Sequence, residues 1–93
     1  MAIAVVTTFP GTTTEQYDQA IEAMGLTAGG RHPGAMFHWV TQTDDGLRVT
    51  DVWQSKEDWE KFLEEQVVPG TQQFGFPEPE ISYVEVHNYM TGA

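Results

Sequence analysis

The order of its strand-like and helix-like segments is the feature that most constrains the fold of this sequence. Four segments are rich in β-branched and aromatic residues, as strands are, at positions 2–9, 35–42, 47–54 and 80–90. Two segments repeat apolar residues at helical spacing, one over residues 13–24 and one that starts at Ser55 and extends to Val67. Along the 93 residues, the predicted order is therefore strand, helix, strand, strand, helix, strand.

Capping and turn residues mark where these segments begin and end. Thr12 and Glu15 match a capping box ahead of the first helix. Pro69-Gly70 interrupts the second helix, and Pro69 is suited to open a fresh short helix over residues 69–75. The segment Thr43-Asp44-Asp45-Gly46 predicts a hairpin between the second and third strands, because Asp-Gly accepts positive φ at little cost.

This order is the ferredoxin-like βαββαβ arrangement, of the α+β class. We expect a single domain over residues 1–93, with a four-stranded antiparallel sheet and two helices on one of its faces. The strands are apolar on both faces: in the first strand, Ile3 and Val5 point one way, and Ala4 and Val6 the other. Since two short helices can cover only one face, we expect a homodimer in which the second faces pack together.

Composition excludes several classes of partner. Fourteen acidic residues face four basic ones, for a net charge of −10. Such a surface cannot neutralise a phosphate backbone, so we expect no nucleic acid and no membrane partner. The absence of cysteine excludes disulfides and a thiol nucleophile. The start MAIAVV lacks the basic residues of a signal peptide, and no apolar run approaches about 20 residues, so we expect a cytoplasmic protein.

Several motifs point to a known family. They are Ala-Val-Val at 4–6, Gly-Ala-Met-Phe-His at 34–38, Thr-Asp-Asp-Gly at 43–46, Arg-Val-Thr-Asp-Val-Trp-Gln-Ser at 48–55, Pro-Glu-Pro-Glu at 77–80 and Val-His-Asn at 86–88. In these motifs, the chain resembles the dimeric α/β-barrel superfamily, particularly its small antibiotic-biosynthesis-monooxygenase-like proteins of actinobacterial type. The resemblance implies a ligand cavity between sheet and helices in each subunit. That superfamily includes cofactor-free monooxygenases, haem-degrading enzymes, lactone isomerases and polyketide cyclases, so the resemblance leaves the reaction open.

His38 and Asp51 are the first candidate catalytic residues. A carboxylate beside an imidazole fixes the tautomer of the ring and stabilises its protonated form, which makes a general base. With a two-residue loop, Asp45-Gly46, both side chains share a sheet face and His38 pairs with Trp53. With a four-residue loop, His38 pairs with Asp51 directly, whereas a three-residue loop puts His38 on the opposite face.

A structural role for Asp51 is the alternative, with its carboxylate bonded to Arg48, a tyrosine or a backbone N–H. His87 is a further catalytic candidate, on one face of the last strand. There it either lies half exposed at the sheet edge or, across a dimer, approaches the partner's His38. The expected substrate-binding residues are mainly aromatic, and several can equally be core residues. They are Tyr17, Met24, Phe37, Trp53, Trp59, Phe62, Tyr83 and Tyr89, with Arg31 in a loop as an anchor for an anionic group.

No metal or other cofactor is expected. His32, His38 and His87 are scattered, without the spacing of a metal site. The haem degraders that the chain resembles carry a ligating histidine on the second helix, which this helix lacks.

The sequence therefore predicts a small cofactor-independent enzyme of monooxygenase, cyclase or isomerase type. Its substrate would be a hydrophobic aromatic or polyketide-like molecule, deprotonated with the help of His38. The alternative is a non-catalytic dimeric barrel with a ligand-binding, structural or stress-associated role.

Overall fold

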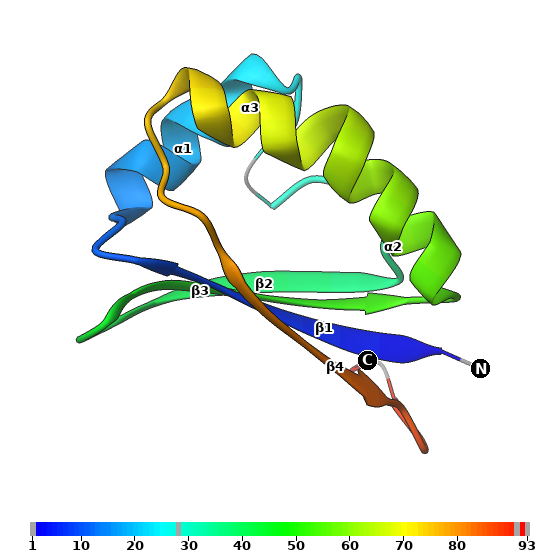
Figure 1. The fold of residues 1–93 in the computed structure, drawn as a ribbon. Coiled ribbons are helices and arrows are strands. Elements are labelled where there is room, and N and C mark those ends of the chain that lie inside the picture. The colour runs from blue at the N-terminus through cyan, green and yellow to red at the C-terminus, as the bar shows by residue number, and fades with distance from the viewer. Residues whose placement is uncertain (1, 28, 91, 93) are drawn as a thin grey trace.

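The computed structural model describes residues 2–27, 29–90 and 92. Its strands are β1 (Ile3–Pro10), β2 (Phe37–Thr43), β3 (Gly46–Trp53) and β4 (Glu80–Glu85). Its helices are α1 (Thr14–Ala23), α2 (Lys56–Phe62) and α3 (Val68–Gln73), with the π-helical turn η1 (Leu63–Val67) between the last two. One sheet forms the lower layer, and the helices form the upper layer (Figure 1).

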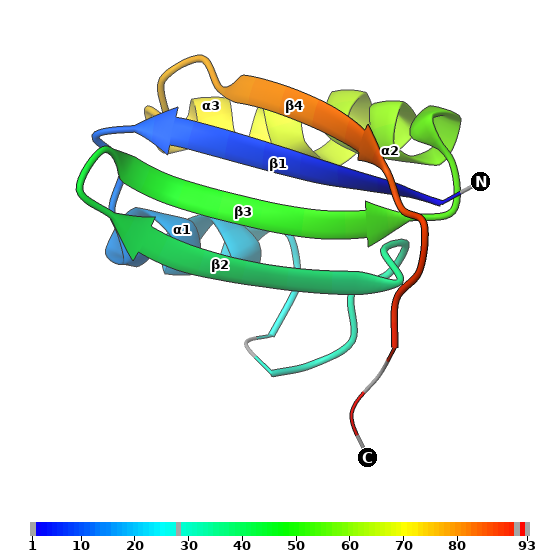
Figure 2. The ribbon, with the colours of Figure 1, turned by 90° about the horizontal axis from the view of Figure 1, so that it is seen from below.

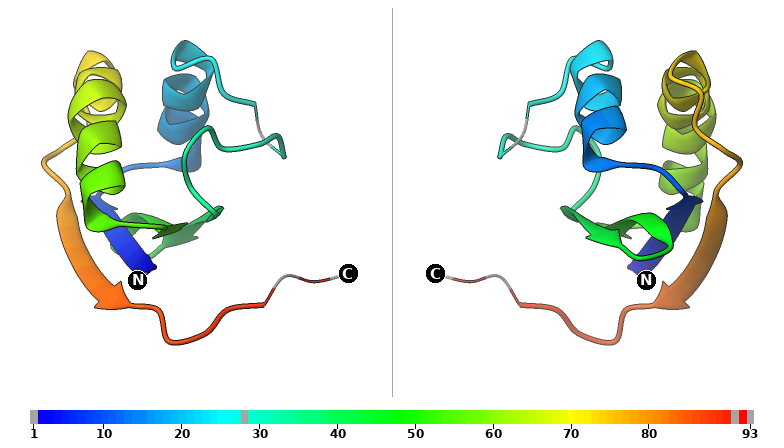
Figure 3. Two further views of the ribbon diagram at one scale, coloured as in Figure 1. Left: turned by 90° about the vertical axis from the view of Figure 1, so that its right-hand side faces the viewer. Right: turned by 90° about the vertical axis from the view of Figure 1, so that its left-hand side faces the viewer.

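The sheet is antiparallel throughout, and its strand order is β2-β3-β1-β4 (Figure 2). The first and third strands are therefore central, and the second and fourth are the edges. All the helical segments lie over the same sheet face (Figure 3). This is the ferredoxin-like α+β fold predicted from the sequence.

Asp44 and Asp45 form the turn of the hairpin, because Thr43 pairs with Gly46. Of the loop lengths left open by the sequence, the register is the one expected for the four-residue connection Thr43 to Gly46, since His38 pairs with Asp51, and the loops of two and three residues are excluded. Gly46 has φ 145°, and a Cβ there would lie 2.3 Å from the carbonyl oxygen of Phe9. Glycine is required at this position because β3 starts so close to the end of β1.

The last strand is shorter than predicted. It ends at Glu85, which pairs with Ile3 at the start of β1, so the predicted strand to residue 90 was wrong beyond that point. The N–H of Val86 still donates to the carbonyl of Ala2, at 3.0 Å. The chain then leaves the sheet edge (Figure 3), and both His87 and Tyr89 are exposed.

The first helix starts with a capping box one residue later than predicted. The side chain of Thr13 accepts from the N–H of Gln16, and the Gln16 side chain accepts from the N–H of Thr13. Gln16 serves as well as a glutamate in this role. Thr12 is buried instead and donates to the carbonyl of Pro10.

The second helical run continues through Pro69 without a break, so the predicted interruption there was wrong. Proline lacks an N–H and clashes with the preceding turn of a regular α-helix. Here the preceding turn is the wider η1, in which the N–H of Val68 donates to Leu63, and Pro69 falls in the first turn of α3. Gly70 then lies directly against Met24, since a Cβ would be 3.2 Å from its Cγ and Sδ, and this contact joins α3 to α1.

Two apolar clusters fill the space between the helices and the inner sheet face. One is built on Val5, Trp53 and Trp59, and the other on Phe9, Leu47 and Val49. Val67, in the π-helical turn, packs against both clusters. The candidate site lies between these clusters and the β2 edge.

The outer sheet face, on the side away from the helices, is apolar and partly exposed. Phe37, Val52, Ala4 and Val84 form one row across all four strands. In the next row, Trp39 and Val6 flank Thr50. Phe37 is 52% exposed, Trp39 47% and Val84 59%. The sequence prediction of a second apolar face is therefore confirmed for this chain.

Candidate active site

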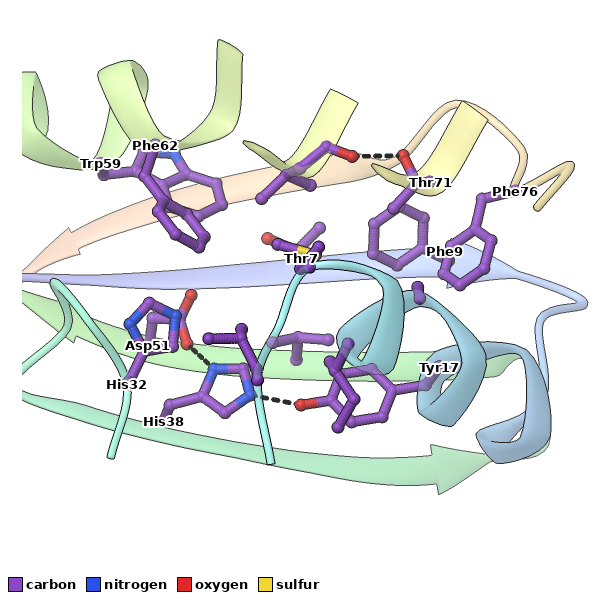
Figure 4. A pocket seen from close by; sticks show the side chains of 16 residues that line it. Thr7, Phe9, Tyr17, His32, His38, Asp51, Trp59, Phe62, Thr71 and Phe76 are labelled. Carbon is purple, nitrogen blue, oxygen red and sulfur yellow. Dashed lines mark hydrogen bonds and ion pairs between the residues drawn. The ribbon is translucent and has the colours of Figure 1, made fainter. Parts of the chain in front are cut away.

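Tyr17, His38 and Asp51 form a hydrogen-bonded row at the inner sheet face (Figure 4). The hairpin register pairs His38 directly with Asp51, and Nδ1 of the ring contacts Oδ1 of the carboxylate. On the other side of the ring, Nε2 lies 2.6 Å from the phenolic oxygen of Tyr17, which reaches over from α1. Asp51 is buried, at 3% exposure, on a central strand. The row thus connects a buried carboxylate to the tyrosine of the covering helix.

Protonation of the row follows from its chemistry. An ionised carboxylate only accepts hydrogen bonds, so Nδ1 of His38 carries the hydrogen that Asp51 accepts. In the neutral ring, Nε2 is then an acceptor, and the O–H of Tyr17 donates to it. The carboxylate therefore sets the tautomer of His38, as the sequence predicts for a general base.

The row borders a cavity of about 70 Å³ between the sheet and the helices. The polar groups at its wall are Thr7, Tyr17, His32, His38, Asp51 and Thr71. The rest of the lining is apolar: Phe9, Ala20, Ile21, Met24, Leu26, Val49, Trp59, Phe62, Val67 and Phe76. A mainly apolar wall with a few polar groups is typical of a site for a hydrophobic small molecule.

A wider groove of about 590 Å³ adjoins the cavity on the side of the β2 edge. It lies between α1, β2 and the described residues 26–27 and 29–36 that connect them, and Arg31 is part of its wall. Tyr17, Ile21, Leu26, His32 and His38 line both spaces. The hydrogen-bonded pair of Tyr17 and His38 therefore stands where the groove meets the cavity.

His32, in the loop before β2, packs against the aromatic side chains of the site. Its ring centroid lies 5.0 Å from that of His38, 4.8 Å from Phe62 and 5.4 Å from Trp53. Its Nδ1 accepts hydrogen bonds from the backbone N–H groups of Gly34 and Ala35. Gly34 allows this close packing, because a Cβ there would lie 2.7 Å from Cζ3 of Trp53.

Burial shifts the titration of two side chains at the site. Burial raises the pKa of Tyr17 to about 12, with smaller contributions from the negative charges of Asp51 and Asp18. Burial also lowers the pKa of His32, and the nearby His38 acts in the same direction, while Asp51 opposes it. Tyr17 is therefore a neutral hydrogen-bond donor over the whole neutral range of pH.

A fully buried side-chain oxygen of the cavity wall lacks a hydrogen-bond partner in the described part of the chain. Thr7 is 2% exposed, and its Oγ1 has no hydrogen-bond partner among the residues that the structure describes. Burying a hydroxyl without a partner destabilises a protein, so such groups are uncommon. This hydroxyl is available to bond a polar atom of a ligand in the cavity.

The remaining predicted site residues lie in four different places. Met24, Trp59 and Phe62 line the cavity, together with Tyr17 and His38. Trp53 is buried behind it, and Arg31 and Phe37 border only the groove. The other three, Tyr83, His87 and Tyr89, are exposed at or beyond β4, the edge strand farthest from β2. The hydroxyl of Tyr83 accepts from the indole N–H of Trp59, at 3.2 Å.

The described part of the chain contains no cluster of metal ligands. Among the residues that can be placed, no three His, Cys, Asp or Glu side chains gather closely enough to hold a metal ion. None of the helices in that part of the chain is long and apolar enough to cross a membrane.

These features define a class: a ferredoxin-like domain with a mainly apolar cavity beneath its helices and a hydrogen-bonded histidine–aspartate pair on its sheet. Neither a protein-family model nor a curated protein matches the sequence. Solved structures do match, over nearly the whole chain. The NE2512 protein of unknown function from Nitrosomonas europaea has a TM-score of 0.68 at 16% identity, with 99% of this chain and 94% of the other covered.

Two oxygenases have the same fold. SnoaB, a cofactor-independent oxygenase from Streptomyces nogalater, matches at TM-score 0.60 and 13% identity, covering 98% of this chain and 97% of its own. The ActVA-Orf6 monooxygenase of Streptomyces coelicolor, solved with nanaomycin D, matches at 0.59 and 14%, covering 99% and 92%. The expected resemblance to antibiotic-biosynthesis-monooxygenase-like proteins is thus confirmed in the fold.

Proposed function

We propose that this protein is a cofactor-independent enzyme that removes a proton from a hydrophobic, aromatic small molecule. The observation that carries the proposal is the hydrogen-bonded pair of a partly exposed His38 and a buried Asp51 at the wall of a mainly apolar cavity. A histidine held in one tautomer by a carboxylate is a general base, and such a base contributes about 10²–10⁴ in rate. Trp59, Phe62 and Met24 would position the substrate and exclude water.

Deprotonation is the step common to three possible reactions. The carbanion or phenolate can react with dioxygen, close a ring or take back a proton at another carbon. These outcomes correspond to a monooxygenase, a cyclase and an isomerase. Two proteins of this fold support the general type: SnoaB is a cofactor-independent oxygenase, and ActVA-Orf6 is a monooxygenase solved with the ligand nanaomycin D.

A screen with quinols tests the enzymatic proposal. We expect the purified protein to accelerate consumption of 1,8-dihydroxyanthrone or 1,4-naphthohydroquinone, measured against the spontaneous reaction in air and under nitrogen. Acceleration in air alone identifies an oxygenase, and acceleration in both identifies a cyclase or isomerase. Asp51→Asn should reduce the rate about 10²-fold or more, whereas Asp44→Asn removes an acid from the hairpin tip and should leave the rate unchanged.

A non-catalytic binding or structural barrel is the second candidate. It is favoured by one observation: both ring nitrogens of His38 already have partners within the chain. In that case, His38→Gln should lower the melting temperature while ligand binding, followed by native mass spectrometry, persists without turnover. Unchanged folding with lost turnover would instead support the enzyme.

We also propose that two copies pack through their outer sheet faces. The row of Phe37, Val52, Ala4 and Val84 would form the centre of that contact, since exposed apolar patches of this kind mark interfaces. Light scattering should give the mass of a dimer at micromolar concentration. Trp39→Glu places a charge beside this row and should give a folded monomer, and a wild-type monomer would contradict the proposal.

A further inference from the structure

The arrangement around His38 leaves neither of its nitrogens open to a substrate. Nδ1 faces the carboxylate of Asp51, and Nε2 lies 2.6 Å from the phenolic oxygen of Tyr17. A substrate proton can therefore reach His38 in this geometry only through that oxygen. The substrate must therefore contact a residue other than His38.

We infer that Tyr17, rather than His38, is the residue that exchanges the proton with the substrate, and that His38 relays it. The inference rests on the proposed function, because it describes how the same base works. The phenolic oxygen donates its one hydrogen to Nε2 and keeps lone pairs that can accept from a substrate C–H or O–H. It also stands where the groove and the cavity meet, within reach of a molecule bound in either space.

The transfer balances in protons and charge. The substrate's proton moves to the oxygen of Tyr17 while the phenolic proton moves to Nε2 of His38. The bond that held the substrate proton leaves its electron pair on the substrate, which becomes an anion. His38 becomes an imidazolium next to the carboxylate of Asp51, and Tyr17 is neutral both before and after the step.

Burial explains why the relay is better placed than a phenolate base. The pKa of Tyr17 is raised to about 12 by burial and by the charge of Asp51, so a resting phenolate is disfavoured. A coupled transfer never forms that phenolate. It leaves the positive charge on the ring of His38, between the carboxylate of Asp51 and the oxygen of Tyr17, which already contact its two nitrogens.

The size of the two spaces indicates where the substrate lies. The inner cavity, at about 70 Å³, has room for a few water molecules or one small substituent. The groove, at about 590 Å³, has room for an aromatic molecule of two or three rings. The inference therefore places the ring system in the groove, with its acidic C–H or O–H directed at Tyr17.

The Kemp elimination of 5-nitrobenzisoxazole tests the relay without knowledge of the natural substrate. A base removes the C3 proton of this bicyclic compound, the N–O bond opens, and a coloured cyanophenolate forms. We expect wild-type protein to catalyse this step, and Tyr17→Phe to lower kcat about 10²-fold at nearly constant KM. His38→Gln should lower kcat to a similar degree. Ser82→Ala removes an exposed hydroxyl from β4 and should change neither parameter.

The possible outcomes separate the relay from the proposed function. If Tyr17→Phe is as fast as wild type, or faster, His38 acts directly, so the relay is wrong while the enzymatic proposal stands. If wild-type protein shows no elimination above buffer with the compound bound, both are wrong. A readout without ligand is the ¹⁵N spectrum of His38: the relay requires the proton of the neutral ring on Nδ1, and a spectrum with that proton on Nε2 overturns it.

Discussion

Replacing Thr7 with valine should stabilise the protein. Thr7 lies on the central strand β1, is 2% exposed, and carries a hydroxyl with no partner in the described structure. Leaving a buried hydroxyl unpaired costs about 1–3 kcal/mol, whereas a methyl group of similar size has no such penalty. Valine also suits a strand as well as threonine does. We expect Thr7→Val to raise the free energy of unfolding by about 1 kcal/mol, which corresponds to roughly 4–8 °C in melting temperature for a chain of this size.

Thermal and urea unfolding, followed by circular dichroism at one fixed protein concentration, would measure this change. The matched control is Thr12→Val, because Thr12 is also buried, at 1% exposure, but its hydroxyl donates to the carbonyl of Pro10. That variant should lose about 0.5–1.5 kcal/mol. If Thr7→Val is destabilised as much as Thr12→Val, the hydroxyl of Thr7 has a partner after all, and the reasoning fails.

Three further predictions concern the loop over the cavity and the titration of the site. Gly34→Ala should cost about 1–3 kcal/mol of stability in urea unfolding, because the added Cβ would clash with the ring of Trp53. The pKa of His32 is lowered on folding, so the stability that its neutral ring contributes is complete above pH 6.5 and is lost as the pH falls below that value. His32→Asn retains an acceptor near the N–H of Ala35 and should make the melting temperature less dependent on pH between pH 5 and 7. The pKa of Tyr17 is raised to about 12, so the contribution of its neutral phenol to the free energy of unfolding is complete below pH 10 and is lost as the pH rises towards 12. Absorbance at 295 nm should show the ionisation of one tyrosine near pH 12 in wild type and not in Tyr17→Phe.

The fold could be predicted because its signals are local. The β-branched and aromatic content of β1 and β3 and the helical spacing of Tyr17 and Met24 depend only on nearby residues. Strand ends were harder, because they depend on pairing. The end of β4 is set by the start of its neighbour at Ile3, which no pattern within residues 80–90 reveals. Likewise, the continuation through Pro69 depends on a π-helical turn that spacing alone does not distinguish from an α-helix.

The candidate site could be predicted in part. Side chains alternate between the two faces of a strand, so a hairpin loop with an even number of residues places His38 and Asp51 on the same face. Their direct pairing could then be predicted once the register of the hairpin was known. The contact of Tyr17 with His38 depends on how α1 lies across the sheet, and the position of His32 depends on the path of a loop. Neither is encoded in local spacing. The unpaired hydroxyl of Thr7 could have been suspected from the sequence, because Thr7 is a polar residue between Val5 and Phe9 on the same face of a buried strand.

The π-helical turn has a consequence for how this pocket can evolve. An i→i+5 turn holds one residue more than an α-helical turn, and such turns recur at functional sites. Deleting one residue from Leu63–Val67 would turn the bond from Val68 to Leu63 into a regular i→i+4 bond, so α3 would keep its orientation relative to α2. The cavity wall at Val67 would change, while Thr71, the contact of Gly70 with Met24, and the sheet with His38 and Asp51 stayed in place. A one-codon insertion or deletion could thus change what the pocket accepts without disturbing its proton chemistry.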